Sequence, residues 1–209
     1  MRSSDPTRLI VNPVIPVITI ENARDAVPLA RALLAGGLRV VEITLRTPAA
    51  LDAIRAVAGE VPDVIVGAGT VLQASDVTRA IEAGAHFLVT PGTPASLAPA
   101  LRDAPVPVMP GCATVSEAMA LAALGFPVLK FFPAEQSGGA RWLKALSEPL
   151  PNIRFCPTGG INGDNAADYL ALRNVIAVGG SWVASSQAIA AGDFAGITAR
   201  AAAAAALRA

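Results

Sequence analysis

Short runs rich in valine and isoleucine alternate along the whole chain with longer segments of helical character, and this alternation restricts the possible folds most strongly. The apolar runs predict eight strands: Val14–Ile20, Val40–Leu45, Val64–Gly67, Phe87–Thr90, Val106–Met109, Val128–Phe132, Arg154–Cys156 and Val175–Val178. The remaining segments predict helices: Ala23–Ala35, Pro48–Ala58, Ser75–Ala83, Pro94–Arg102, Ser116–Leu124, Ala140–Leu146, Asp164–Leu172 and Phe194–Arg208. Buried strands that alternate with helices favour parallel pairing.

The strand–helix unit recurs eight times within 209 residues, and no change of composition marks a linker. We therefore expect one α/β domain over residues 1–209, folded as a (β/α)8 TIM barrel and ending in an alanine-rich helix. An open doubly wound sheet is the alternative.

Composition excludes several classes of partner. The formal net charge is zero and the arginines are scattered, so no basic surface suggests nucleic acid. Proline or glycine interrupts each apolar stretch before the roughly 20 residues that a membrane-spanning helix needs. The run Leu9–Pro13 is too short for a signal peptide. Cys112 and Cys156 lack CxxC spacing, which suggests reduced thiols in a cytoplasmic protein.

Polar and glycine residues follow almost every predicted strand. They are Glu42, Thr44 and Arg46 at the second strand, Gly69 and Thr70 at the third, Thr90 and Pro91 at the fourth, Cys112 and Thr114 at the fifth, Lys130 and Glu135 at the sixth, Thr158 to Gly160 at the seventh, and Gly179 to Ser181 at the eighth. In a barrel these positions meet at the C-terminal rim, where the active sites of this fold lie.

Lys130 is the only charge in the apolar run from Phe126 to Ala134. Lysine is almost never fully buried without a partner or a function. Desolvation disfavours the ammonium form, and the neutral amine can attack a carbonyl group. The alternative is an edge strand whose lysine extends to water.

Glu42 and Thr44 share one face of their strand, while Val41, Ile43 and Leu45 share the other. If the apolar face packs on helices, Glu42 points into the barrel, as Lys130 does. A carboxylate there can act as general acid and base for a lysine nucleophile. A purely structural ion pair is the alternative, although such pairs seldom add net stability.

The glycine pairs Gly159–Gly160 and Gly179–Gly180, with Ser181, follow the last two strands, where barrels often bind phosphate. Arg46 can hold a carboxylate with two hydrogen bonds, and Thr70 can donate to the same group.

With these residues assembled, the chain resembles the 2-dehydro-3-deoxy-6-phosphogluconate (KDPG) and 4-hydroxy-2-oxoglutarate aldolases, which are class I aldolases. The resemblance extends from about Pro13 to Trp182. It rests on the segments Pro13–Ile18, Val41–Thr47, Val66–Val71, Lys130–Glu135, Arg154–Ile161 and Gly179–Trp182.

The resemblance implies that Lys130 forms the Schiff base and that Glu42 is the catalytic glutamate. It also implies substrate-binding roles: Arg46 and Thr70 at the pyruvyl carboxylate, Gly159, Gly160 and Ser181 at the phosphate, and Pro91 and Phe132 in the pocket wall. The expected reaction is cleavage of KDPG, a small phosphorylated keto acid, to pyruvate and D-glyceraldehyde 3-phosphate in the Entner–Doudoroff pathway. The expected enzyme is a cytoplasmic homotrimer that uses no metal and no cofactor.

Two segments depart from the family pattern. Thr19–Ala23 lacks the basic residues that some members carry there, and Cys112–Ala113 stands where isoleucine and serine are expected. Neither departure touches Lys130 or Glu42.

Other functions remain open at this stage. The substrate can instead be 4-hydroxy-2-oxoglutarate or the 6-phosphogalactonate isomer. A metal-dependent phosphosugar barrel needs clustered ligands, and the chain has a single histidine. A non-enzymatic phosphosugar-binding barrel has no reason to bury Lys130.

Overall fold

Parallel strands and helices alternate through the chain, as the sequence predicts. The computed structural model describes Pro6 and residues 11–208, so both ends of the expected domain 1–209, and the start of the run Leu9–Pro13, lie outside the described residues. The strands are β1 Val14–Ile18, β2 Val40–Thr44, β3 Ile65–Gly69, β4 Leu88–Val89, β5 Val108–Met109, β6 Gly111–Cys112, β7 Val128–Phe131, β8 Arg154–Pro157 and β9 Val178–Gly180.

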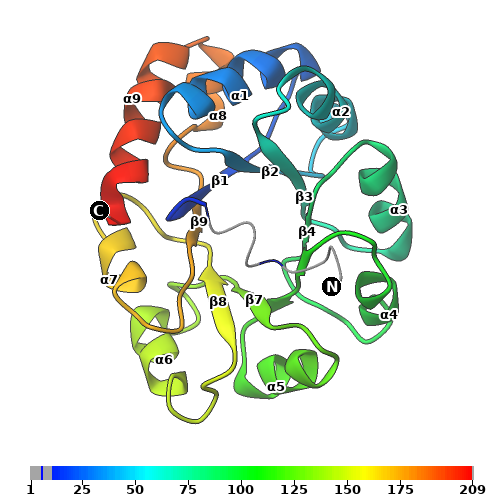
Figure 1. Ribbon diagram of the computed structural model, residues 1–209, viewed down its shortest axis with the longest axis vertical. Helices are drawn as coiled ribbons and strands as arrows, with labels where there is room; N and C mark the ends of the chain where they lie inside the picture. Colours follow the sequence, from blue (N-terminus) through cyan, green and yellow to red (C-terminus); the bar gives the residue numbers. More distant parts are fainter. Residues whose placement is uncertain (1–5, 7–10, 209) are drawn as a thin grey trace.

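The helices form an outer ring around these strands (Figure 1). They are α1 Ala26–Ala35, α2 Ala50–Glu60, α3 Ala74–Glu82, α4 Ala98–Arg102, α5 Val115–Ala123, α6 Gly139–Leu146, α7 Ala166–Leu170, α8 Ser186–Ala190 and α9 Phe194–Ala205. Short 3-10 turns at Ala23–Asp25 and Ala206–Arg208 precede α1 and follow α9. Along the described chain, no helix combines the length and the apolar character needed to cross a bilayer.

All strand pairs are parallel, which confirms an α/β fold. Six strands form one sheet in the order β5-β4-β3-β2-β1-β9, and three form a second in the order β6-β7-β8. The two sheets approach each other at both ends. Isolated parallel bridges join Phe155 to Val175 and Thr158 to Gly179, and β5 and β6 are separated only by Pro110.

The predicted fifth strand ends at Met109 as observed, but it begins at Val108 rather than Val106, and a further strand, β6, follows it. Proline has no backbone N–H to donate to a ladder, and Pro110 separates β5 from β6. The Pro110 carbonyl still accepts a hydrogen bond from Lys130 N at 2.9 Å. β6 therefore starts the pairing with β7.

The last strand and the last helices also differ from prediction. The strand expected at Val175–Val178 is Val178–Gly180, because the ladder with β1 continues through both glycines. The helix α8 is missing from the prediction; the Ser185 hydroxyl caps it by accepting a hydrogen bond from Ala188 N at 3.2 Å. The predicted helix over Phe194–Arg208 is observed as α9 with its final 3-10 turn.

Two apolar clusters lie on opposite faces of the strands. The larger packs the outward residues, such as Val41, Ile43 and Leu129, against the helices. The smaller, which we call the inner core, consists of Ile15, Val40, Phe87, Val89, Met109, Val128, Cys156, Ile176 and Ala177. Side chains two residues further along each strand point to the same inward face and lie nearer the C-terminal ends of the strands. Glu42 follows Val40 and Lys130 follows Val128 in this way.

Candidate active site

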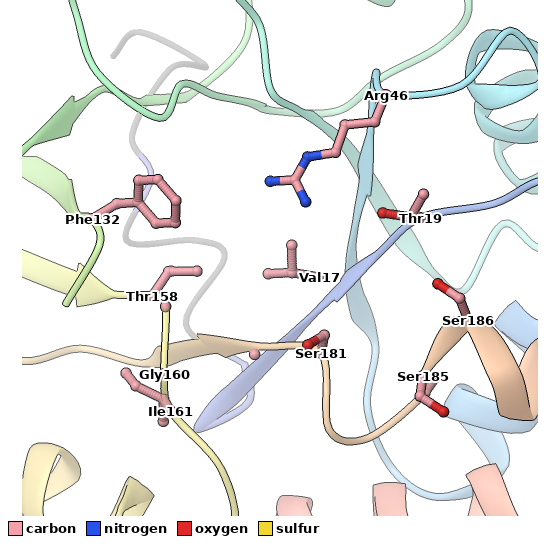
Figure 2. Close-up of a pocket in the computed structure, with 13 residues that line it drawn as sticks. Val17, Thr19, Arg46, Phe132, Thr158, Gly160, Ile161, Ser181, Ser185 and Ser186 are labelled. Atoms are coloured by element: carbon pink, nitrogen blue, oxygen red, sulfur yellow. The ribbon is translucent and has the colours of Figure 1, made fainter. Parts of the chain in front are cut away.

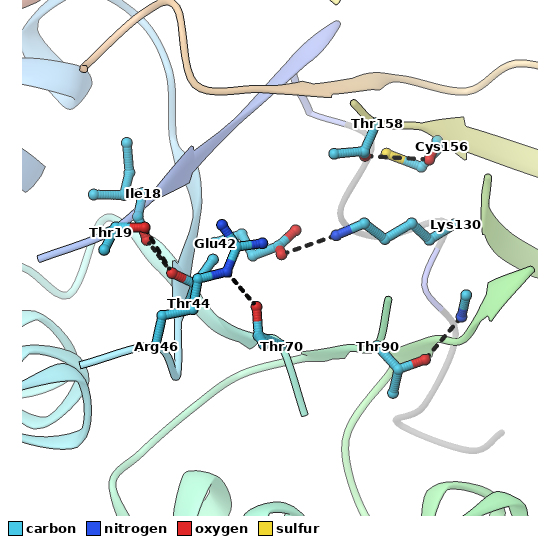
Figure 3. Close-up of polar contacts among 11 residues, drawn as sticks. Ile18, Thr19, Glu42, Thr44, Arg46, Thr70, Thr90, Lys130, Cys156 and Thr158 are labelled. Carbon is cyan, nitrogen blue, oxygen red and sulfur yellow. Dashed lines mark hydrogen bonds and ion pairs between the residues drawn. The ribbon is translucent and has the colours of Figure 1, made fainter. Parts of the chain in front are cut away.

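Lys130 and Glu42 meet directly inside the ring of strands. Lys130 Nζ lies 3.2 Å from Glu42 Oε1, and the two residues are only 4% and 3% exposed. Figure 3 shows the lysine reaching from β7 toward the carboxylate on β2. The inward orientation that the alternation predicts for both residues is confirmed. A proton can pass along this hydrogen bond, which would leave a neutral amine beside a neutral acid.

Gly69 on β3 leaves the room that the Glu42 carboxyl group occupies. A Cβ atom at Gly69 would lie 2.0 Å from Glu42 Oε1 and 2.6 Å from its Cδ. Any other residue at this position would therefore displace the carboxylate. The absence of a side chain at Gly69 thus helps to determine the position of the Glu42 carboxylate.

The neighbour of the pair on β8 is Cys156, which stands opposite Lys130 in the ladder. Burial raises the pKa of the Cys156 thiol to about 12, and the Glu42 carboxylate adds to this shift. The thiol is therefore protonated at neutral pH and is not a nucleophile there. Both cysteines are free, as predicted from their spacing, and both are buried.

Arg46 and Thr70 form a second polar pair at the same end of the strands. Arg46 Nε donates to Thr70 Oγ1 over 3.1 Å. Thr70 has φ of +58°, and no other described non-glycine residue has a positive φ. Such a conformation is costly and is maintained where the surroundings require it. Here it turns the threonine hydroxyl toward the guanidinium.

A cavity of about 330 Å³ opens beside these residues. Of the predicted site residues, Arg46, Phe132, Gly159, Gly160 and Ser181 line it (Figure 2). Among the described residues of its wall, Arg46 is the only one that carries a charge. Phe132 connects the cavity to the lysine, because its ring centroid lies 5.4 Å from Lys130 Nζ. Lys130 thus lies next to a residue of the cavity wall, although it is not itself part of that wall.

The turn Gly159–Gly160 exposes backbone to the cavity and requires glycine. The two residues have φ of +101° and +77°, which side chains rarely adopt. The loop after β7 holds the turn, since Ala134 N donates to Thr158 O at 2.8 Å and Glu135 N donates to Gly159 O at 3.1 Å. Glu135 is itself bound by the buried Tyr169 hydroxyl.

Four predicted residues are not part of the cavity wall. Lys130 and Glu42 lie deeper, Thr70 contacts Arg46, and Pro91 lies close to the backbone of Gly111. The wall also contains polar residues to which the sequence analysis gave no role, namely Thr19, Thr158, Ser185 and Ser186. Thr158 was visible as a strand-end residue. The serines carried only the weak signal of a helix cap.

Solved structures with this fold bear on the chemistry. A KDPG aldolase from Legionella pneumophila, with pyruvate captured at low pH as a covalent carbinolamine intermediate, matches with a TM-score of 0.95 and 43% identity, over 97% of this chain and 99% of that one. The 2-keto-3-deoxy-6-phosphogluconate aldolase of Zymomonas mobilis ZM4 with 3-phosphoglycerate matches with a TM-score of 0.89 and 45% identity, over 97% and 94%. Fold and site together define the class: the protein is an aldolase, a lyase that acts on carbon–carbon bonds.

Sequence comparison narrows the class to one family. The KHG/KDPG aldolase of Escherichia coli (strain K12) is 48% identical over 197 residues, which are 94% of this chain and 92% of that protein. The 2-dehydro-3-deoxy-phosphogluconate aldolase of Dickeya dadantii (strain 3937) is 49% identical over 191 residues, which are 91% and 90%. The family model "KDPG and KHG aldolase" matches residues 7–200. The chain belongs to this family, which confirms the resemblance stated from the sequence.

Proposed function

We propose that the protein cleaves KDPG to pyruvate and D-glyceraldehyde 3-phosphate through a Schiff base on Lys130. The observation that carries this proposal is the buried Lys130–Glu42 contact of 3.2 Å below the cavity. This contact places an amine and a group that can carry a proton within hydrogen-bond distance of each other. The names of the relatives and the carbinolamine in the Legionella structure support the same reaction.

The proposed reaction begins when the neutral Lys130 amine adds to the C2 ketone and water leaves, which gives an iminium ion. Glu42, directly or through a water molecule, takes the proton of the C4 hydroxyl. The C3–C4 electron pair then moves into the iminium, so the aldehyde leaves and an enamine of pyruvate remains. Glu42 returns a proton to C3, and water hydrolyses the iminium to pyruvate and free Lys130.

The two ends of the substrate need separate anchors. Arg46, with Thr70, holds the carboxylate, because a guanidinium matches it with parallel N–H donors. Backbone N–H groups at Gly159 and Gly160 and the Ser181 hydroxyl hold the phosphate. Phe132, in the cavity wall, borders the chain between them, and Pro91, which lies outside that wall, borders it from beyond the end of β4. Anchoring both ends positions the scissile bond over Glu42.

A second substrate, 4-hydroxy-2-oxoglutarate, is favoured by one observation. The described residues that line the phosphate end of the cavity are neutral, and such groups can bind a second carboxylate as well as a phosphate. The kcat/KM values of the wild-type enzyme for 4-hydroxy-2-oxoglutarate and for KDPG, measured side by side, decide between the two substrates. The 6-phosphogalactonate isomer differs only in stereochemistry and is compared in the same assay.

The proposal includes the architecture and the setting. The two sheets form one closed (β/α)8 barrel in a single domain; β1 pairs with the last strand β9, and the inner core draws residues from β1, β2, β4, β5, β7 and β8. The enzyme acts as a cytoplasmic homotrimer in the Entner–Doudoroff pathway, binds neither nucleic acid nor membrane, and uses no metal or cofactor. Within the described part of the chain, no cluster of three or more histidine, cysteine, aspartate or glutamate side chains is placed to hold a metal ion.

The deciding experiment is borohydride reduction in the presence of pyruvate, followed by peptide mass spectrometry. We expect a reduced pyruvyl adduct on Lys130. The only other lysine, Lys144, is exposed on α6 and serves as an internal control. An adduct on Lys144 alone, or none, would contradict the Schiff-base mechanism. Turnover of KDPG is then measured by coupling pyruvate release to lactate dehydrogenase.

A further inference from the structure

Thr19 places a hydroxyl in the cavity wall that the proposed reaction leaves without a role. It follows the C-terminal end of β1 and lines the cavity together with Val17, two residues earlier on the same face. Figure 2 shows its oxygen on the cavity side, between Arg46 and Ser186. The question is which substrate group this oxygen can meet.

Its hydrogen-bond partners determine the direction in which Thr19 acts. The Thr44 side chain is fully buried and donates its single proton to the Ile18 carbonyl over 3.0 Å. Thr44 Oγ1 also lies 3.1 Å from Thr19 Oγ1 (Figure 3). Since a hydroxyl has one proton, Thr19 must be the donor in this second contact. Its oxygen therefore offers only lone pairs to the cavity.

An oxygen that can only accept a hydrogen bond cannot pair with the ionised carboxylate or phosphate of the substrate. Carboxylate and phosphate oxygens carry no proton to give when fully ionised, and the neighbouring Arg46 supplies donors for the first of them. The donors of KDPG are its hydroxyls at C4 and C5. The C4 hydroxyl gives its proton to Glu42 in the proposed reaction. The C5 hydroxyl is the donor that remains.

The depth of Thr19 in the cavity agrees with the C5 hydroxyl as its hydrogen-bond donor. Val17 is the register partner of Glu42 in the ladder between β1 and β2. Thr19 lies two residues further toward the mouth, which is about 6–7 Å along a strand. C5 is the carbon on the phosphate side of the cleaved bond, so the proposed reaction, with the C4 hydroxyl at Glu42, puts C5 nearer the mouth than C4.

We propose that Thr19 is a specificity-determining residue that accepts a hydrogen bond from the C5 hydroxyl of the substrate, with Thr44 as the residue that orients it. This inference rests on the proposed function. In the condensation direction the same hydroxyl is the C2 hydroxyl of glyceraldehyde 3-phosphate. Thr19 thereby distinguishes hydroxylated aldehydes from their deoxy analogues.

The test compares two aldehydes in condensation with saturating pyruvate. These are D-glyceraldehyde 3-phosphate and 3-hydroxypropanal phosphate, which lacks only the hydroxyl in question. The measured quantity is the ratio of their kcat/KM values. In Thr19→Val we expect this ratio to fall about fivefold, the range of one neutral hydrogen bond. Thr19→Ser keeps the hydroxyl and should keep the wild-type ratio.

Thr44→Val provides a second, nearly isosteric variant. It leaves the Thr19 hydroxyl in place but removes the group that receives its proton, so the ratio should fall here too. An unchanged ratio in Thr19→Val, or an equal loss for both aldehydes, would show that Thr19 only shapes the wall and would overturn the inference. Failure of the proposed function is distinguishable, because it would appear in the wild type as absence of the Lys130 adduct.

Discussion

Replacement of Gly69 by alanine tests the position of the Glu42 carboxylate without changing either member of the Lys130–Glu42 pair. The new Cβ would stand 2.0 Å from Glu42 Oε1, whereas real Cβ contacts are not shorter than 3.0 Å. The oxygen must therefore move by at least about 1 Å from its position 3.2 Å from Lys130 Nζ. A misplacement of about 1 Å can reduce a rate about 10²-fold.

We expect kcat for KDPG cleavage in Gly69→Ala to fall about 10²-fold, while borohydride still traps pyruvate on Lys130. The amine is left in place, and only the proton carrier moves. Turnover is followed by lactate dehydrogenase coupling, and trapping by mass spectrometry of the intact protein.

Gly67→Ala is the matched control on the same face of the same strand. Its Cβ would lie 2.4 Å from ring carbons of Phe87, in the inner core. We expect a loss of stability of about 1–3 kcal/mol from overpacking, with a smaller change in kcat than in Gly69→Ala. Thermal unfolding of both variants separates the two effects. A Gly69→Ala enzyme within twofold of wild-type kcat would refute the assigned role of Glu42.

Three further outcomes follow from the same geometry. Lys130→Met should abolish turnover. It should also lower the free energy of unfolding, measured by urea titration, by about 3–5 kcal/mol, because the buried Glu42 loses its partner. Unchanged stability would contradict the buried pair. Gly160→Ala should raise KM for KDPG, because a Cβ there meets Glu135 Cγ at 2.6 Å and φ is +77°; a KM equal to wild type would remove this turn from the phosphate site. Burial raises the pKa of the Cys112 and Cys156 thiols from 9.0 to about 12. The unfolded chain therefore loses these protons at lower pH than the folded protein, and the free energy of unfolding should fall as the pH rises from about 9 toward 12. Chemical unfolding of Cys156→Ala across this range should show a smaller fall in the free energy of unfolding than the wild type.

The inward face of the central strands could be predicted from sequence because alternation is a local property. Val40 and Val128 are apolar and precede Glu42 and Lys130 by two residues, so one period fixes all four on the same side. Lys130 could be predicted as a chemically important residue because it is a charge within an apolar pattern.

The contacts between distant segments could not be predicted in this way. The hydrogen bond between Thr19 and Thr44 joins two strands, and both residues are common in strands for reasons unrelated to function. The helix α8 is short and lacks a strong periodic pattern, so its serines were not recognised as part of the cavity. The strand β6 was also missed, because Gly111 and Cys112 follow Pro110 and form no apolar run that would predict a strand.

The inner core has a consequence for stereochemistry. Val40 and Val128 of the inner core precede Glu42 and Lys130 by two residues on the same face of their strands, so in the proposed reaction the substrate approaches the amine from the opposite side, at the cavity. In the proposed reaction one carboxylate, Glu42, delivers the proton to C3 from a single direction. Loss of the aldehyde and arrival of the new proton at C3 must occur on the same face of the planar enamine. Pyruvate whose methyl group is labelled with deuterium and tritium should thus be formed with retention of configuration.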